Sequence, residues 1–406
     1  MRDRVILHCD CNSFFASVET ALNPFLAHVP MAVCGDPEQR HGIVLAKNEL
    51  AKAYGIKTAQ TVHEAKRLCP NLVIVPPSYE KYVEYSHRVN AIYSEYTDLI
   101  EPFGIDESWL DVTASGRLFG DGPEIAEIIR KRVEREIGIT ISVGVSFNKV
   151  FAKLGSDYKK PNAVTVISRD NYQRIVYPLP VEWLLYVGKK TVEILDGIGI
   201  KTIGDLSSAP IELLSYKLGK FGEMISSFAK GEDSSPVNAE REDVKSVGNG
   251  FTFKKDLLSF EEIRCGVYYL SEEIGTRLRA KGLSCSTVSV QIKDEFLRVS
   301  QKQCQLNSPT DISREIADSA LKIIQASWTP SRPIRTITIT ASGLSHASEV
   351  ATQIDFFSNE SSDEERARQR RNEEAVDEIR RKFGQSAIVR GVYIDNKIGL
   401  IDPRKK

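Results

Sequence analysis

The sequence predicts a multidomain protein of the α+β class, and three observations lead to this prediction. A chain of 406 residues is too long for one compact core. Strand-like and helix-like segments alternate up to about residue 168, and strands mixed with helices return from residue 245. Between these parts lies an entirely helical stretch, 169–230, followed by the polar, acidic segment 231–244, whose composition is typical of a linker.

The composition is that of an ordinary soluble protein, with 41% hydrophobic and 27% charged residues. The net charge of −1 and the pI of about 6.6 give no overall signature of nucleic-acid binding. A surface that binds nucleic acid would have to be local, with its basic residues offset by acids elsewhere.

Cysteine usage and hydropathy indicate the compartment. The seven cysteines form no CxxC pair and leave one over, which favours a reducing compartment and argues against a zinc site. The apolar run near the N-terminus is too short for a signal peptide or a membrane span. No later stretch reaches the ~18 apolar residues that a spanning helix requires. We therefore expect a soluble, cytoplasmic monomer with no membrane partner.

The first predicted elements are a buried strand and a helix. VILHCD (5–10) is a short β-branched run that ends on an acid, Asp10. The next segment starts at Ser13, a possible N-cap, and stops at Asn23-Pro24, which predicts a helix between these residues.

Strands and helices then alternate up to residue 147, with glycine or proline at several helix ends. Strands are predicted at 31–36, 42–48 and 139–147, a strand with a turn at 104–112, and helices at 48–55, 61–70, 79–97 and 123–138.

The later elements fall into three groups. The segment 187–206, within the helical stretch, has a helical pattern that glycine turns interrupt twice. Four strand-like runs in 245–345 accompany helices near 260–281 and 312–327. The tail after residue 345 contains a short apolar motif, a charge-dense run that predicts a helix, and SAIVRGVYI (386–394), which predicts a strand.

Three acids, Asp10, Asp106 and Glu107, stand at the ends or turns of apolar strands. Brought together they would repel one another unless they surround a cation, and oxygen ligands without His or Cys at ligand spacing favour Mg²⁺ or Mn²⁺. Because neighbouring side chains of a regular strand face opposite ways, Asp106 and Glu107 can share a site only at a turn or bulge. A surface turn with two exposed acids would have the same sequence. His8 and His63 suit ordinary packed or surface histidines.

Four blocks of sequence, in one order, resemble the Y-family (translesion) DNA polymerases, most closely the bacterial DNA polymerase IV (DinB) branch. They are Asp10, CNSFFASVE (11–19), GIDESWLDV (104–112) and SVGVSFNKVFAKLGSDYKKPN (142–162). The order and spacing match from about residue 5 to 345, and weakly beyond. Four ordered blocks are a far more specific signal than any single motif.

The resemblance implies a right-hand polymerase with a ferredoxin-like palm, small fingers, a helical thumb and an α+β little-finger domain. The implied divisions are 1–13 with 80–168 for the palm, 14–79 for the fingers, 169–232 for the thumb, 233–244 for a linker, 245–345 for the little finger and 346–406 for a C-terminal tail.

The implied activity is template-directed DNA synthesis by two-metal nucleotidyl transfer, with primer-template DNA and dNTPs as substrates. Low fidelity and synthesis past damaged bases follow, since no stretch supplies the separate domain that a proofreading exonuclease needs. By the resemblance Asp10, Asp106 and Glu107, with the backbone carbonyl of Cys11, bind two Mg²⁺ ions, or Mn²⁺. One ion accompanies the triphosphate and the other activates the primer 3′-hydroxyl.

The resemblance also assigns nucleotide contacts. Phe15 matches the steric gate, a ring packed where a ribose 2′-OH would lie, while Phe14 is either core or sugar packing. Lys160, before Pro161, matches the triphosphate-binding lysine, with Lys159 as its less favoured neighbour. By sequence alone this basic segment would equally suit a solvated loop.

Two residues of the expected nucleotide pocket depart from the family pattern. Glu49 and Lys52 stand where the family commonly has a Tyr and an Arg that contact the phosphates. Lys52 keeps the charge without the bidentate fork, and Glu49 would repel phosphate unless it points away or pairs with Lys47 or Lys52. Asn12 stands where the family often has an acid, at a position that we do not count as a metal ligand.

Further features match DNA-binding parts of the family. The glycine turns of 187–206 resemble helix-hairpin-helix turns, which offer backbone amides to phosphates, although loops between packed helices explain them nearly as well. Residues 244–345 contain 14 Lys/Arg against 10 Asp/Glu, which fits a domain that grips the DNA backbone and also fits ordinary solvated charges.

The apolar motif of the tail is QIDFF (353–357). It resembles the clamp-binding pentapeptide of bacterial replication proteins, with Gln353, Ile354, Phe356 and Phe357 as its contact residues, so a sliding clamp is the expected partner. A chance match to so short a pattern is the alternative.

Two other functions were weighed against the polymerase. A nucleotide cyclase shares the palm chemistry but needs no thumb, linker and little finger. A catalytically weak family member that acts as a DNA- or clamp-bound adaptor would explain Glu49 and Lys52, but such a protein would be expected to lose the three acids. The sequence therefore favours an active polymerase.

Overall fold

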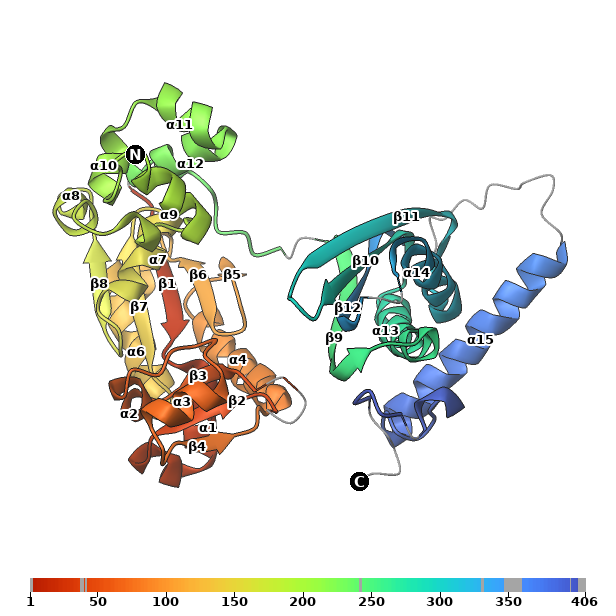
Figure 1. The fold of residues 1–406 in the computed structure, drawn as a ribbon. Coiled ribbons are helices and arrows are strands. Elements are labelled where there is room, and N and C mark those ends of the chain that lie inside the picture. Colours follow the sequence, from red (N-terminus) through yellow and green to blue (C-terminus); the bar gives the residue numbers. More distant parts are fainter. Residues whose placement is uncertain are drawn as a thin grey trace. The chain divides into compact units, whose positions relative to one another are not determined.

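The computed structural model describes residues 3–36, 40, 42–240, 243–329, 332–346, 360–394 and 396–400 (Figure 1). The chain forms two compact units, one of residues 1–35 with 43–241 and the other of 36–42 with 242–406. None of the helices in these described ranges has the length and apolar character that crossing a membrane requires.

A five-stranded sheet lies at the centre of the first unit, in the order β5-β6-β1-β7-β8. Its strands are β1 (Ile6–Cys11), β5 (Ile100–Pro102), β6 (Glu107–Asp111), β7 (Ile141–Ser146) and β8 (Val164–Ile167). The central strand β1 runs antiparallel to both neighbours, while β7 and β8 are parallel. Every residue of β1 is buried, as its β-branched, apolar sequence predicts.

The two faces of this sheet have different partners, because side chains alternate along β1. Leu7, Cys9 and Cys11 join the core formed with α4 (Tyr79–Ser94) and α6 (Gly122–Ile137). Ile6 packs with Trp109 and with Ala152 of α7 (Lys149–Tyr158). The alternation therefore turns His8 and Asp10 toward α7.

Glycine lets α7 lie directly on the sheet. A Cβ at Gly144 of β7 would stand 1.9 Å from the carbonyl oxygen of Ala152, so no larger residue fits there. Gly155 meets the Gly144 Cα from the helix side, with its own added Cβ at 3.0 Å. This close approach brings the side chains of α7 over the end of β1.

A smaller three-stranded sheet, in the order β3-β2-β4, lies between β1 and α4 in sequence. Its strands are β2 (Met31–Cys34), β3 (Val44–Lys47) and β4 (Val73–Val75), and its helices are α1 (Phe14–Leu22), a 3₁₀ turn at Pro24–His28, α2 (Glu49–Ala53) and α3 (Val62–Leu68). Helix α1 agrees with the prediction, except that the side chain of Ser13 makes no capping hydrogen bond.

The stretch after residue 168 is helical, as predicted. It contains α8 (Tyr172–Val176), a 3₁₀ turn at Val181–Trp183, α9 (Lys189–Asp196), α10 (Ile203–Ser208), α11 (Ile211–Leu218) and α12 (Lys220–Ala229) around one apolar core. The chain then runs back along the first unit, where Arg4 Nη1 donates to Ser235 O and the Asn238 amide donates to Glu101. The first part of the predicted linker is thus fastened to this unit.

The second unit is built on a four-stranded antiparallel sheet in the order β11-β10-β12-β9. Its elements are β9 (Ser246–Leu257), α13 (Phe260–Ala280), β10 (Leu283–Asp294), β11 (Val299–Thr310), α14 (Ser313–Ser327) and β12 (Ile334–His346). Helices α13 and α14 bury their apolar faces against the sheet in a separate core. Both predicted helices and all four predicted strands are present.

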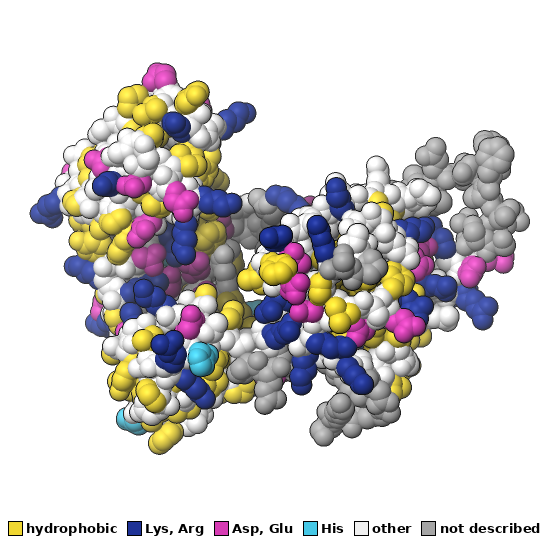
Figure 2. Space-filling model, in the orientation of Figure 1, with side chains coloured by type: hydrophobic (Ala, Val, Ile, Leu, Met, Phe, Trp, Pro, Cys, Tyr) yellow, Lys and Arg dark blue, Asp and Glu magenta, His cyan; other side chains and the backbone are white. Residues whose placement is uncertain are grey.

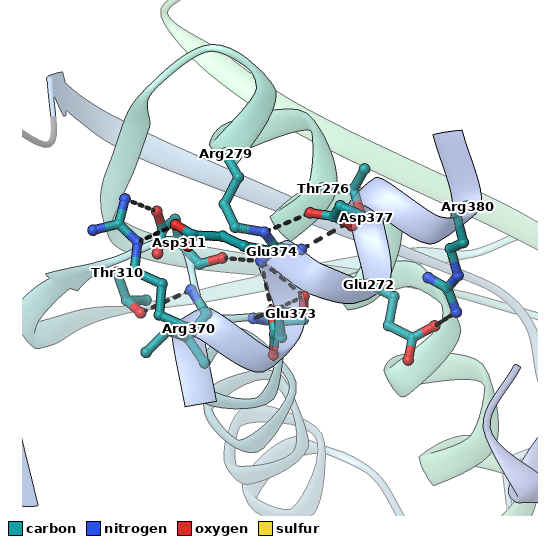
Figure 3. A network of polar contacts seen from close by, with 12 residues as sticks. Glu272, Thr276, Arg279, Thr310, Asp311, Arg370, Glu373, Glu374, Asp377 and Arg380 are labelled. Atoms are coloured by element: carbon teal, nitrogen blue, oxygen red, sulfur yellow. Dashed lines mark hydrogen bonds and ion pairs between the residues drawn. The ribbon is translucent and has the colours of Figure 1, made fainter. Parts of the chain in front are cut away.

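The C-terminal segment belongs to the second unit. The charge-dense run forms α15 (Glu360–Phe383), and a network of arginines and carboxylates joins it to α13 and to the start of α14 (Figure 3). Beyond it Tyr393 and Ile398 are buried in the core of this unit.

One predicted element of this segment is wrong. SAIVRGVYI does not form a strand in its described residues, which contain only a 3₁₀ turn at Gly391–Tyr393. Side chains take its carbonyl groups instead, since Arg380 Nε donates to Ile388 O and Cys265 Sγ donates to Val392 O. The motif QIDFF (353–357) lies outside the described residues.

Candidate active site

The three predicted acids lie at one end of the five-stranded sheet. Asp10, next to last in β1, stands directly opposite Glu107, the first residue of β6. Asp106 precedes that strand, in the bend at 104–106, and its carbonyl accepts from the Cys11 amide at 2.9 Å. The turn that adjacent acids would need in order to share a site is therefore present.

The bend directs Asp106 and Glu107 along the same side. A Cβ built on Gly104 would lie 3.4 Å from Asp106 Oδ1 and 3.5 Å from Glu107 Cγ, so both acidic side chains pass over this glycine. Ligand atoms of His8, Asp10 and Glu107 all lie within 4.8 Å of one another, the spacing of a metal site. Asp106 lies beside this group and outside that limit.

Burial makes the negative charge of these acids unfavourable. It raises the pKa of Asp106, and the neighbouring Asp10 raises it further. Burial also raises the pKa of Glu107, although a hydrogen bond from Lys153 opposes this shift. The fold therefore holds carboxylates where a positive charge must stabilise them.

Two lysines supply part of that charge. Lys153 Nζ lies 2.5 Å from Glu107 Oε2 and 3.2 Å from Asp10 Oδ2. Lys160 Nζ lies 2.8 Å from Asp10 Oδ2 and 2.8 Å from Asp157 Oδ1. Burial alone would lower the pKa of both lysines, but their carboxylate partners together raise it, so both ammonium groups are charged.

The cluster nevertheless keeps a surplus of negative charge. With all groups ionised, Asp10, Asp106, Glu107 and Asp157 bring four negative charges against the two positive charges of the lysines. In the view of Figure 2, acidic side chains gather on the first unit over the region of α7 and β6, with basic side chains beside them. Such a surplus suits the binding of further cations.

His8 is the most deeply buried side chain of the cluster. It is fully buried, its ring meets Trp109 edge-on at 5.1 Å, and its Nδ1 lies 2.8 Å from Ser156 Oγ. Burial lowers the pKa of His8, and Lys153 and Lys160 lower it further, so the ring is neutral. Its Nε2 lies 3.5 Å from Glu107 Oε2 and has no hydrogen-bond partner among the described residues.

Asn12 ties the end of β1 to the turn after α7. Its Oδ1 accepts from the Asn162 amide at 2.8 Å and from Thr140 Oγ1 at 3.1 Å, while its Nδ2 donates to Ser142 Oγ at 2.9 Å. An amide can accept and donate at once, whereas an ionised acid could only accept. Asn12 therefore helps to hold the turn that begins at Lys160.

The two phenylalanines at the start of α1 differ in exposure. Phe14 is 3% exposed and lies in the core of the first unit. Phe15 is half-buried and stacks on Tyr82, with ring centroids 4.2 Å apart, while Tyr79 meets it edge-on. The aromatic neighbours hold Phe15 in one orientation while part of its surface remains accessible.

Glu49 and Lys52, which stand where the family commonly has a Tyr and an Arg, lie on α2. Lys52 Nζ is 3.4 Å from Glu49 Oε2, and both side chains are more than half exposed. Glu49 thus pairs with Lys52, while Lys47 Nζ donates to Thr58 Oγ1 at 3.0 Å. Glu49 also lines a cavity of about 330 Å³, together with Asn12 and the Asn162 turn.

Sequence reasoning missed two members of the cluster. Lys153 lies on α7 four residues before Asp157, a spacing that places these two side chains on one face of the helix, whereas Lys160 lies beyond the end of α7. His8 precedes Asp10 by two residues on β1, so strand alternation places both on the same face. Lys159, the less favoured neighbour of Lys160, is exposed at the end of α7.

The predicted DNA-facing features have the expected local form. Gly188 precedes α9, and Gly199, with φ +82°, forms the turn before α10. On the second unit, Lys and Arg side chains are spread over the visible face among acidic ones (Figure 2).

Two family models match the chain. The impB/mucB/samB family matches residues 9–157, and the impB/mucB/samB family C-terminal domain matches residues 244–356. DNA polymerase IV of Acetivibrio thermocellus is 46% identical over 396 residues, which cover 97% of this chain and 98% of the relative. DNA polymerase IV 2 of Bacillus subtilis is 35% identical over 402 residues, with 97% and 95% covered.

A solved structure is similar in fold. A Y-family DNA polymerase chimera superposes with a TM-score of 0.75, covering 84% of this chain and 98% of that chain at 24% identity. At this identity the likeness establishes the multidomain fold alone.

Proposed function

Because this chain belongs to the Y family of DNA polymerases, in the bacterial DNA polymerase IV branch, we propose that its acid cluster binds the divalent ions of DNA synthesis. The chain is a DNA-directed DNA polymerase of the translesion class, acting on primer-template DNA and dNTPs. The roles of individual side chains in each step are part of our proposal.

The observation that supports the metal site best is the pairing of Asp10 with Glu107 across β1 and β6, with Asp106 in the bend beside them. The donor set fits divalent ions: carboxylates that burial makes costly to ionise, and ammonium groups already held against them. In our proposal Asp10, Asp106, Glu107 and the Cys11 carbonyl hold two Mg²⁺ ions, with Mn²⁺ as a substitute. When bound, such ions make the primer 3′-hydroxyl more acidic and neutralise charge on the triphosphate.

The remaining roles follow from position. Lys160, 31% exposed, can turn from Asp10 to a triphosphate without leaving the site. Phe15, held by Tyr82, would exclude a ribose 2′-hydroxyl, and Phe14 supports it from the core. Lys52 is the exposed cation that could reach the phosphates from α2, and its contact with Glu49 weakens that role.

Primer extension tests the site directly. Wild type, Asp106→Ala and Asp98→Ala would be compared with Mg²⁺ on an undamaged template, with dNTPs or rNTPs offered. Asp98 is an exposed acid on the connection to β5 and serves as the control. We expect dNTP extension by wild type and Asp98→Ala and loss on the order of 10³-fold in Asp106→Ala, since one group that stabilises transition-state charge is removed.

Phe15→Ala tests the gate in the same assay. Use of rNTPs should rise about 10²-fold relative to dNTPs, the scale on which one steric contact discriminates substrates. Undiminished extension by Asp106→Ala would contradict the metal-site proposal, and unchanged rNTP use by Phe15→Ala would contradict the gate alone.

We also propose a sliding clamp as partner through QIDFF, with Gln353, Ile354, Phe356 and Phe357 as contacts, and action of the monomer on DNA in the cytoplasm. The position of the motif at the C-terminal end of the matched C-terminal domain, which runs to residue 356, supports the clamp proposal. Deletion of 353–357 should abolish clamp binding and shorten extension products while leaving single-nucleotide insertion intact. Unchanged clamp binding after the deletion would contradict it.

A further inference from the structure

Lys153 has a position that nucleotide binding does not explain. Its side chain is only 18% exposed, deeper than that of Lys160, and its ammonium contacts both Glu107 and Asp10. The glycine contact between α7 and β7 holds the helix so close to the sheet that Lys153 must lie over these acids.

We propose that Lys153 is a displaceable counter-ion of the metal site. Its ammonium holds Asp10 and Glu107 together while no divalent ion is bound, and it leaves them when an ion enters. This inference rests on the proposed function of the acid cluster as the metal site.

Competition for the same oxygens requires this exchange. A divalent ion bound to Glu107 Oε2 and Asp10 Oδ2 would use the atoms that Lys153 Nζ approaches at 2.5 and 3.2 Å. An ammonium and a divalent ion that close together repel strongly in a partly buried site. The lysine and the ion therefore compete for these two oxygen atoms.

Asp157 provides the second position for the lysine. Its Oδ2 lies 3.5 Å from Lys153 Nζ, one turn along α7, and its side chain is 39% exposed. A small movement of the flexible lysine chain away from Glu107 would exchange one carboxylate for another. Lys160 already contacts Asp157 at 2.8 Å, so both lysines can release Asp10 and keep a partner.

Mn²⁺ binding without nucleotide or DNA, followed by electron paramagnetic resonance, tests the exchange. Lys153→Met keeps the length of the side chain and removes the charge. It should bind Mn²⁺ at least about tenfold more tightly than wild type, because the ion no longer displaces a cation. In EDTA the variant should melt roughly 5 °C lower, with Mn²⁺ restoring more stability than in wild type.

Lys149→Met is the matched control. Lys149 lies on the same helix, is 12% exposed and pairs with Glu101 at 2.7 Å rather than with Asp10 or Glu107. Its loss should lower the melting temperature without changing Mn²⁺ affinity. Unchanged or weaker Mn²⁺ binding by Lys153→Met would overturn the inference.

If Lys153→Met does not fold, wild-type protein still gives the answer. Acetylation of lysines, followed by mass spectrometry, should modify Lys153 severalfold faster with Mn²⁺ than with EDTA, while Lys149 is unchanged; equal rates for Lys153 would overturn the inference. Asp10→Ala separates the two proposals. If it leaves Mn²⁺ binding intact, the metal site itself fails; if it weakens binding while Lys153→Met has no effect, only the role of Lys153 fails.

Discussion

Two clusters of charged residues in this molecule use different cations. In the first unit, Lys153 and Lys160 contact acids that outnumber them. In the second unit, arginines join α15 to the rest of the domain. Arg279, 7% exposed, contacts Glu373 at 2.5 Å and Asp377 at 2.7 Å and donates to Asp311 O at 2.7 Å (Figure 3).

The difference follows from the two side chains. Guanidinium groups form several hydrogen bonds in a rigid plane, whereas an ammonium on a flexible stem is a point charge that changes partners easily. Arg370 contacts Asp311 at 2.8 Å, and Arg380 and Arg390 both contact Glu272, so the buried carboxylates of the second cluster have arginine partners. We infer that the arginine contacts hold α15 permanently against the rest of the second unit. The lysine contacts in the first unit, by contrast, can be replaced by contacts to a bound ion.

The largest expected effect separates activity from stability at Asp106. Asp106→Asn should reduce DNA synthesis on the order of 10³-fold, while Asp98→Asn should not. The same change should raise the melting temperature in EDTA at pH 7 by a few degrees, because burial and Asp10 raise the pKa of Asp106 and make its ionised form unfavourable.

The sign of this stability effect can be checked by pH. A carboxyl with a raised folded pKa destabilises the protein fully above that pKa, and the penalty disappears as the pH falls below its ordinary value of 3.8. The advantage of Asp106→Asn should therefore be present at pH 7 and shrink as the pH falls toward 4. A loss of stability at pH 7 would show that Asp106 is already well paired.

Removal of one arginine should weaken the attachment of α15 to the rest of the second unit. Arg279→Met leaves Glu373 and Asp377, which are only 14% and 15% exposed, without their arginine partner. Unfolding by urea should therefore show a loss of about 3 kcal/mol, and trypsin should cut within α15 more readily. Arg314→Met, at a 61% exposed side chain 3.9 Å from Asp318, should change stability by less than about 0.5 kcal/mol. Equal losses of stability in the two variants would contradict the distinction between the arginine contacts of α15 and an exposed ion pair.

Replacing arginine by lysine in the second unit, and lysine by arginine in the first, tests the difference between the two clusters directly. Arg279→Lys keeps the charge but cannot make all three contacts, so we expect a loss of about 1–2 kcal/mol in urea unfolding. Lys153→Arg should hold Asp10 and Glu107 more firmly and weaken Mn²⁺ binding by about tenfold. Tighter Mn²⁺ binding by Lys153→Arg would contradict an exchangeable counter-ion.

The smallest expected effect concerns the exposed pair on α2. Glu49→Gln should lower the KM for dNTPs by about two- to threefold, because a negative charge that lines the cavity beside the Asn162 turn is removed and Lys52 is released. Its effect on stability should be below about 0.5 kcal/mol, since both side chains are exposed. A raised KM would indicate that Glu49 itself supports nucleotide binding.

Local sequence patterns determined most of the elements of this protein. A buried β-branched run located β1, start and stop residues located α1, and helical spacing located α6, which buries one face. Strand-like runs located the strands of the second unit. The strand predicted at 386–394 is absent because periodicity does not record which groups form hydrogen bonds. A short β-branched run specifies no hydrogen-bond partner, and side chains from α13 and α15 took its carbonyls.

At the candidate site, the sequence by itself determined the acids, the turn that adjacent acids require, and the kinship with polymerases. Only the tertiary structure decided which cations meet those acids. Lys153 reaches Asp10 and Glu107 because Gly144 and Gly155 let α7 lie directly on the sheet, and because register sets Asp10 opposite Glu107. Such contacts join residues far apart in the chain, and local sequence patterns do not indicate which distant residues come close together in space.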